Sequence, residues 1–339
     1  MIQNTQPSLK LPYGIDDLNP SVEYYATKPA RVRCYVRDCD QLLEVPTRQQ
    51  RGQVCPRHGI RCHYSGGKPT YAYAEATENL IVARELFRQQ VVGSPFKFES
   101  HRFGLERSED ALTWNVFRSL QDAGHLHHIA RRITGDDCGH EPLLYLWGLC
   151  LSEDDFEPWH LLIKARERFE SNLPVERPLT EPDIALFLPG RYLILIEAKF
   201  TSSNTCYERG PRRSTSSLTL DELRDIYHDP TTQLLDRRAA SMADRIYYQL
   251  WRNMVFAEWM AREDHSKTQA FHVNLVRQGQ DEASAEEFSR LVNLNFKDRF
   301  QQRTWEGLYR EMKTLADLTQ LRRYLETKTS GLRPAFRLR

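Results

Sequence analysis

Residues 182–200 read PDIALFLPGRYLILIEAKF and contain two short apolar runs, DIALFL and RYLILIEAKF. Pro189 and Gly190 lie between the runs, and this pair of residues is a strong turn signal. Short apolar runs on either side of a turn are typical of paired strands. We therefore expect the two runs to form an antiparallel hairpin in the core of the protein.

Three charged residues border or interrupt this apolar hairpin. Side chains alternate between the two faces of a strand, so Glu197 and Lys199 point to one side and Ala198 to the other. Asp183 stands at the start of the first strand, with thirteen residues between it and Glu197. An antiparallel pairing brings it near the end of the second strand. Because buried charges are costly unless they are used or paired, the sequence predicts a site where two carboxylates and an ammonium group converge.

Such a pair of carboxylates suits a hard divalent cation. Mg²⁺ prefers oxygen ligands and keeps several waters, so Asp183, Glu197 and the backbone carbonyl of Ala198 make a reasonable site. A cation there polarises a scissile phosphate and lowers the pKa of a bound water. Lys199 would orient that water and offset charge on the phosphate. Because Lys199 lies between two carboxylates, we assign it positioning and electrostatics before general-base work.

The segments around the hairpin predict helices and a further strand. From about residue 72 to 170 the pattern is largely helical, and Ser108 is a candidate N-cap. AFHVNLVRQ, residues 270–278, is typical of a strand. Apolar residues recur at three- and four-residue spacings in residues 109–124, 155–171 and 240–263.

A five-residue pattern resembles the signature of the PD-(D/E)XK nuclease superfamily, to which restriction endonucleases belong. It is formed by Pro182, Asp183, Glu197, Ala198 and Lys199. The order helix, hairpin, helix, strand is also similar to the family core, over roughly residues 100–310. The resemblance implies an α/β fold with a restriction-endonuclease-like mixed sheet flanked by helices. It further implies hydrolysis of DNA, or less often RNA, that depends on Mg²⁺ or Mn²⁺.

The resemblance implies two supporting residues as well. The family often adds a glutamate from the helix before the hairpin, where Glu109 is the best match and Asp110 the second. One exonuclease-like branch places a Gln or Tyr on the helix after the lysine strand. Here Gln249 is the candidate and Tyr247 the alternative. On this basis, Glu109 would support a second cation or a water, and Gln249 would join the catalytic group.

The N-terminal segment carries a cluster of cysteines and histidines. Four of the seven cysteines lie between residues 34 and 62, and in a reducing compartment such clustering favours a metal over disulfides. Two close pairs separated by a fifteen-residue excursion are typical of a structural zinc site on two knuckles, similar to a zinc ribbon. The predicted Zn²⁺ ligands are Cys34, Cys39, Cys55 and His58, with Cys62 or His63 as alternatives to His58.

Attraction to nucleic acid must come from local patches, because the formal net charge of the whole chain is only +1. Between Lys28 and Lys68 there are nine Lys or Arg against three Asp or Glu. This excess favours contact with a phosphate backbone, although a solvated face of a small domain has the same composition. Arg209, Arg212 and Arg213 lie just after the proposed active strand and are candidates to clamp the substrate.

The length of 339 residues favours two domains. We predict a zinc-ribbon-like module with a basic surface over residues 1–70 and a nuclease domain over residues 71–339. No apolar run approaches the length of a membrane span, and the N-terminus lacks the basic and apolar regions of a signal peptide. We therefore expect a cytoplasmic protein that does not enter a membrane.

These features together predict a Mg²⁺-dependent DNA endonuclease whose zinc module helps to hold nucleic acid. The resemblance alone suggests a role in defence against foreign DNA. The alternative, from a different class, is a non-catalytic zinc-ribbon adaptor that uses the nuclease fold to bind nucleic acid or a partner protein. An exonuclease and an RNA-directed nuclease also stay open, as do a homodimer and a partner protein that gates the activity.

Overall fold

The structure is a computed structural model of the 339-residue chain. Contacts between residues divide the chain into two compact units: unit 1 comprises residues 1–123 and 309–339, and unit 2 comprises residues 124–308. The structure describes residues 11–19, 30–47, 50–65, 68–92, 100–137, 139–151, 156–173, 179–208, 218–227, 234–236, 243, 245–265 and 267–338.

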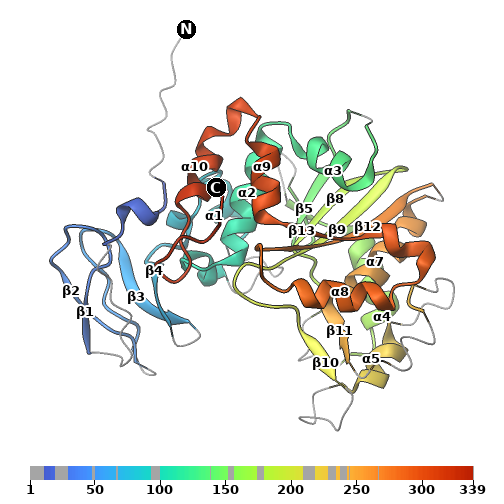
Figure 1. The fold of residues 1–339 in the computed structure, drawn as a ribbon, viewed down its shortest axis with the longest axis horizontal. Coiled ribbons are helices and arrows are strands. Elements are labelled where there is room, and N and C mark those ends of the chain that lie inside the picture. Colours follow the sequence, from blue (N-terminus) through green and yellow to red (C-terminus); the bar gives the residue numbers. More distant parts are fainter. Residues whose placement is uncertain are drawn as a thin grey trace. The chain divides into compact units, whose positions relative to one another are not determined.

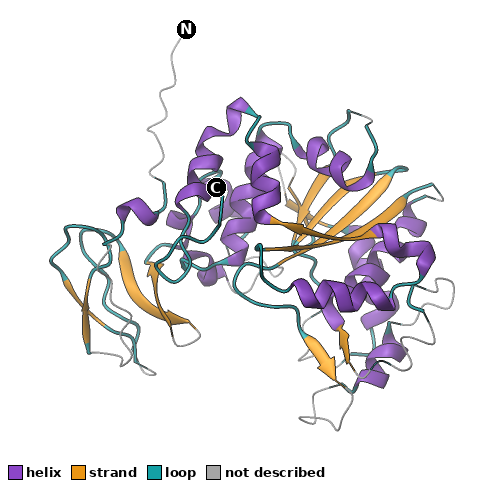
Figure 2. Ribbon diagram, viewed as in Figure 1, coloured by secondary structure: helices purple, strands orange, loops and turns teal. Residues whose placement is uncertain are grey.

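A seven-stranded mixed sheet forms the centre of unit 2 (Figures 1 and 2). The strand order is β13-β12-β9-β8-β5-β6-β7. β12 runs parallel to β9 and β13, and the remaining neighbours are antiparallel. With helices beside it, this sheet confirms the predicted α/β fold class. The strands are β5 (Leu143–Leu146), β6 (Leu149–Leu151), β7 (Phe156–Pro158), β8 (Ile184–Leu188), β9 (Tyr192–Ala198), β12 (Gln269–Val276) and β13 (Phe300–Thr304).

The hairpin predicted from the apolar runs is β8 and β9, which pair from Ile184↔Ile196 to Leu188↔Tyr192. Gly190 has a φ of +71° in the connecting turn, a conformation that costs glycine little. Every residue of β9 is buried, because the strand lies between β8 and β12 and is covered on both faces. The charged end of this strand is therefore held in a rigid part of the sheet.

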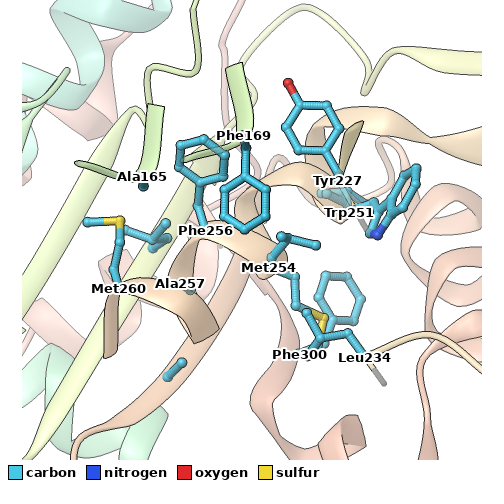
Figure 3. Close-up of a cluster of buried hydrophobic side chains, with 14 of the residues drawn as sticks. Ala165, Phe169, Tyr227, Leu234, Trp251, Met254, Phe256, Ala257, Met260 and Phe300 are labelled. Atoms are coloured by element: carbon cyan, nitrogen blue, oxygen red, sulfur yellow. The ribbon is translucent and has the colours of Figure 1, made fainter. Parts of the chain in front are cut away.

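Helix α7 packs against β9 and β12 on one face of the sheet. The helices of unit 2 include α3 (Leu126–Thr134), α4 (His160–Glu170), α5 (Leu220–Ile226), α7 (Tyr248–Asp264) and α8 (Glu282–Leu291). Figure 3 shows part of the apolar cluster to which α7 contributes Met254 and Phe256, with Phe169 of α4 against Phe256. Burying side chains of this size contributes about 1.5–3 kcal/mol each. No helix among the described residues is both long and apolar enough to cross a lipid bilayer.

The long helix predicted over residues 240–263 begins later than expected. Residues Arg245–Tyr247 form strand β11, which pairs antiparallel with β10 (Cys206–Glu208). Ile246 is fully buried in this ribbon, so an apolar residue that fitted the helical pattern fits a strand instead. The strands β5 to β7 were likewise absent from the prediction, which was largely helical over residues 72–170, and β13 was not predicted.

Unit 1 contains two small β-ribbons and several helices. β1 (Arg31–Arg33) pairs with β2 (Leu42–Glu44), and β3 (Ile60–Ser65) pairs with β4 (Lys68–Tyr73). Its helices include α1 (Arg84–Gln90), α2 (Glu109–Asp122) and α10 (Thr319–Thr327), while α9 (Trp305–Met312) crosses the division between the units. Ser108 caps α2 as predicted, since its hydroxyl accepts a hydrogen bond from the backbone N–H of Ala111 at 3.0 Å.

The C-terminal segment completes unit 1 around the buried residue Glu106. The side chain of Glu106 accepts hydrogen bonds from the hydroxyl of Thr70 and from the backbone N–H of Leu332. The ammonium of Lys328 donates to the backbone carbonyl of Glu106 at 2.6 Å. Because β4 and these contacts continue past residue 70, the predicted domain boundary at residue 70 falls inside unit 1.

Candidate active site

The end of β9 brings the two carboxylates of the hairpin together. The register Ile184↔Ile196, continued by one residue, places Asp183 opposite Glu197. The backbone N–H of Ala198 donates a 2.8 Å hydrogen bond to Oδ2 of Asp183. Side chains of directly opposed residues share a face of the sheet, so both carboxylates lie on the face that α7 covers.

Glu197 is 2% exposed and accepts three hydrogen bonds. Nζ of Lys199 lies 2.6 Å and Nε2 of Gln249 lies 2.7 Å from its Oε1. Nδ2 of Asn253 lies 2.6 Å from its Oε2. Burial by itself raises the pKa of Glu197, but the positive charges of Lys199 and Arg252 and the hydrogen bonds outweigh it, so the net effect lowers this pKa. Glu197 is therefore ionised at neutral pH and held in one orientation.

Two amides of α7 fix the position of this carboxylate. Gln249 and Asn253 are four residues apart, and this spacing places both on the same side of a helix. Oε1 of Gln249 accepts a hydrogen bond from the backbone N–H of Thr205 at 3.1 Å, which leaves its NH₂ group to face Glu197. Asn253 was missed by the sequence reasoning, although its spacing from Gln249 would have indicated it.

Several buried polar atoms around Glu197 have no hydrogen-bond partner within the described part of the chain. β12 contributes two of them, since Asn274 pairs in register with Glu197 and His272 with Leu195. The pKa of His272 falls to about 4, because burial disfavours its charged form while Glu197 offsets only part of this effect, so its imidazole is neutral. The unpartnered atoms are Nδ2 of Asn274, Nε2 of His272, Oδ1 of Asn253, Oδ1 of Asn204 and Nε of Arg252.

This environment fits a hydrated divalent cation. Buried polar groups almost always find a partner, and ordered water or an ion is the usual one where the protein supplies none. The carboxylates of Asp183 and Glu197 offer the oxygen ligands that hard cations prefer. The orphaned atoms nearby would then be served by the waters that such a cation retains.

The other residues predicted for the site lie in other elements of the structure or outside the described residues. Glu109 begins α2 in unit 1, whereas Asp183, Glu197, Lys199 and Gln249 belong to unit 2, so its role stays a prediction. The hydroxyl of Tyr247, the alternative to Gln249, donates a hydrogen bond to Glu287 at 3.2 Å. Arg209, Arg212 and Arg213 lie outside the described residues.

A second cluster in unit 1 has the geometry of a tetrahedral metal site. Among the described residues, the ligand atoms of Cys34, Cys39, Cys55 and His58 all lie within 4.8 Å of one another. The Sγ atoms of Cys39 and Cys55 are 3.8 Å apart, and Nδ1 of His58 is 3.6 Å from Sγ of Cys34 and 3.5 Å from Sγ of Cys55. Zinc–sulfur bonds of about 2.3 Å in a tetrahedron require sulfur atoms roughly 3.8 Å apart.

Each pair of these side chains lies on a tight turn. Asp38, beside Cys39, has a φ of 60°, and Gly59, beside His58, has a φ of +66°. The backbone N–H groups of His58 and Gly59 both donate to the carbonyl of Cys55. The alternatives to His58 are not part of this group: Sγ of Cys62 lies 3.0 Å from the hydroxyl of Tyr35, and His63 lies in β3.

Comparison with known proteins gives one family. A family model described as "Restriction Endonuclease associating with ARP" matches residues 42–328, which include Asp183, Glu197, Lys199 and Gln249 and, of the second cluster, Cys55 and His58. Comparisons with curated proteins and with solved structures give no match. The family match extends over most of the chain and agrees with the restriction-endonuclease-like resemblance of the hairpin. This chain therefore belongs to the family described as "Restriction Endonuclease associating with ARP".

Proposed function

We propose that this protein is a metal-dependent nuclease that hydrolyses phosphodiester bonds of DNA, as an endonuclease in defence against foreign DNA. The observation that carries the proposal is the buried carboxylate of Glu197, bonded to Lys199, Gln249 and Asn253. It lies beside Asp183 at the end of a rigid strand. The family description adds support for a nuclease and names an association with ARP, so a partner protein belongs to the proposal.

In this proposal some residues of the site bind the cation and others stabilise the reacting phosphate. Asp183 and Glu197 would hold Mg²⁺ or Mn²⁺, which when bound polarises the scissile phosphate and supplies an activated water. Gln249 and Asn253 keep the Glu197 carboxylate oriented. Lys199 would orient the attacking water and offset the negative charge that grows on the phosphate.

Both backbone polar groups of Lys199 are hydrogen-bonded, and this restricts the orientation of its side chain. Its N–H donates to the carbonyl of Leu275 at 2.7 Å. Its carbonyl accepts from Nε1 of Trp305 at 3.1 Å. Positioning of this kind lowers the entropic cost of aligning the reacting groups.

The four ligands in unit 1 would hold a structural Zn²⁺. Thiolates and imidazole are the ligands that zinc prefers, and four protein ligands leave no open position for catalysis. The module would then present its basic surface to nucleic acid.

The test is cleavage of supercoiled plasmid and of single-stranded DNA with Mg²⁺ or Mn²⁺. We expect wild type to cut, and both Glu197→Gln and Lys199→Met to lose at least about 100-fold of the rate, as expected for groups that act in the transition state. Matched controls are Glu263→Gln and Lys267→Met, which change exposed residues of unit 2 and should leave cutting intact. Cutting by the Glu197 variant at the wild-type rate would refute the site. A wild type that binds DNA but cuts with neither metal would favour the adaptor function.

A further inference from the structure

Arg252 lies on the face of α7 that holds Glu197. It is three residues after Gln249 and one before Asn253, and residues three and four apart are neighbours on a helix surface. Only 9% of Arg252 is exposed. An arginine placed so deeply beside an active-site carboxylate needs an explanation, because buried cations are nearly always paired.

Within the described residues, Arg252 donates no hydrogen bond and forms no ion pair, and its buried Nε has no partner. Its guanidinium lies against an aromatic ring: the guanidinium carbon is 5.0 Å from the ring centroid of Tyr248. Arg299, near the same helix, behaves differently, since its guanidinium lies 2.8 Å from a carboxylate oxygen of Glu258. Arg252 is thus held by stacking, with its donors left for another group.

The two carboxylates whose charges raise the pKa of Arg252, those of Glu197 and Glu170, already accept hydrogen bonds from other residues. Burial lowers the pKa of Arg252, but Tyr248, Glu197, Tyr227 and Glu170 raise it by more, so the guanidinium is firmly charged. Both oxygens of Glu197 accept hydrogen bonds from other residues. Glu170 accepts from the backbone N–H and the hydroxyl of Thr180, and from the hydroxyl of Tyr227 at 2.7 Å.

We propose that Arg252 binds a phosphate oxygen of nucleic acid at the Glu197 site. A guanidinium presents its donors in a planar fork that matches phosphate oxygens, and stacking on an aromatic ring holds the fork in place. A phosphate is the anion that the neighbouring Asp183, Glu197 and Lys199 are expected to receive. The identity of the ligand rests on the proposed function, but binding alone tests the contact.

The experiment measures the affinity of the full chain for a DNA duplex and a single strand, with Ca²⁺ as the divalent cation, across a series of salt concentrations. Wild type is compared with Arg252→Met, Arg252→Lys and Arg262→Met, the last removing an exposed arginine from the same helix. We expect Arg252→Met to bind at least about tenfold more weakly. The slope of log affinity against log salt should lose about 0.9 on the duplex or about 0.7 on the single strand, the value of one phosphate contact.

Arg252→Lys keeps the charge but loses the fork, so it should bind more weakly than wild type with the wild-type slope. Arg262→Met should match wild type in both. Thermal unfolding of each variant is recorded beside the binding. If the Arg252 variants only melt earlier, and bind with wild-type affinity and slope, Arg252 is structural and the proposal is overturned. A wild type without affinity for either DNA overturns it too.

Plasmid cleavage with Mg²⁺ and Mn²⁺ separates this proposal from the nuclease function. Loss of affinity and slope in Arg252→Met, together with a wild type that cuts nothing, would support the phosphate contact and refute the nuclease. A wild type that cuts, joined to an Arg252→Met variant that binds and cuts at the wild-type level, would support the nuclease and refute the contact.

Discussion

Glu197 owes its orientation to side chains that are distant in sequence. Asn253, 56 residues further along the chain, donates to one carboxylate oxygen, and Gln249 and Lys199 donate to the other. All three donors favour the charged carboxylate. Replacing one donor by an acceptor of the same shape should therefore change the acidity of Glu197 as well as its orientation.

The substitution Asn253→Asp places a second carboxylate against Glu197. Like charges at hydrogen-bond distance oppose ionisation, so the pKa of Glu197 should rise. If Glu197 must be ionised for cleavage, the acid limb of the pH–rate profile moves to higher pH, and on that limb the rate falls roughly tenfold for each unit by which the pKa rises. The profile of cleavage rate against pH measures this. Asn295→Asp, at an exposed site of unit 2, serves as the control, and an unmoved acid limb would contradict the role of Asn253.

The sequence predicted the part of the site that is local. Asp183, Glu197 and Lys199 could be found because a strand fixes which side chains share a face, and one turn fixes which strand ends meet. Asn253 was within reach only through its four-residue spacing from Gln249, and Arg252, His272 and Asn274 could not be found in this way. Their place depends on how α7 and β12 pack onto β9, and apolar periodicity predicts the existence of such elements without their register.

At the scale of elements, the first ribbon of unit 1 is short. β1 and β2 have three residues each, and an isolated pair of this length is marginally stable in water. The knuckles beside them bring together three thiols and an imidazole. A bound zinc would therefore contribute directly to the folding of this segment.

Serine substitutions of Cys55 and Cys62 distinguish a predicted zinc ligand from a nearby cysteine that does not bind the metal. Cys55→Ser should lose the bound zinc and lower the melting temperature, since a ligand of the tetrahedral site is gone. Cys62→Ser should keep one zinc per chain, because Cys62 contacts Tyr35 and not the cluster. Metal content by mass spectrometry and thermal unfolding with and without a chelator measure both effects. Zinc lost from the Cys62 variant, or a wild type that never carries zinc, would contradict the assignment.

Element prediction succeeded where a pattern was long or bounded by strong signals. The Pro-Gly turn identified β8 and β9, and a capped, periodic run identified α2. Strands β6 and β7 have three residues each, too few for a period of two to be distinguished from a helical one. β11 was missed for the same reason, since its three residues lead directly into α7.

At the scale of the whole molecule, unit 1 is discontinuous. Residues 309–339 join residues 1–123, and Lys328 and Leu332 bind Glu106 across more than 200 positions of sequence. Lys328 is buried, and burial lowers its pKa to about 8, with Glu106 offsetting part of the effect. Burying the charged ammonium therefore lowers the free energy of unfolding of unit 1, and the size of this effect depends on pH.

The substitution Lys328→Met tests this cost. The unfolded chain holds the Lys328 proton up to an ordinary pKa of about 10.5, whereas the folded chain releases it near pH 8. Unfolded protein thus binds more protons between these values, so the free energy of unfolding of wild type should rise with pH relative to the variant. The rise is at most about 3 kcal/mol. Urea denaturation at pH 7.5 and pH 10 measures it, with Lys313→Met, at an exposed position, as control. A difference that is flat or falls with pH would contradict the prediction.

Because unit 1 is formed by both the N-terminal and the C-terminal segments of the chain, it cannot be completed until late in translation. A ribosome that has released residues 1–123 must still make the 185 residues of unit 2 before it reaches residue 309. At about 5–20 residues per second this takes roughly 10–40 s. Until then Glu106 lacks Lys328 and Leu332, and the emerging N-terminal chain is open to chaperones and proteases. Chains interrupted before residue 309 would lack the contacts of Lys328 and Leu332 with Glu106, and we expect them to be targets for degradation.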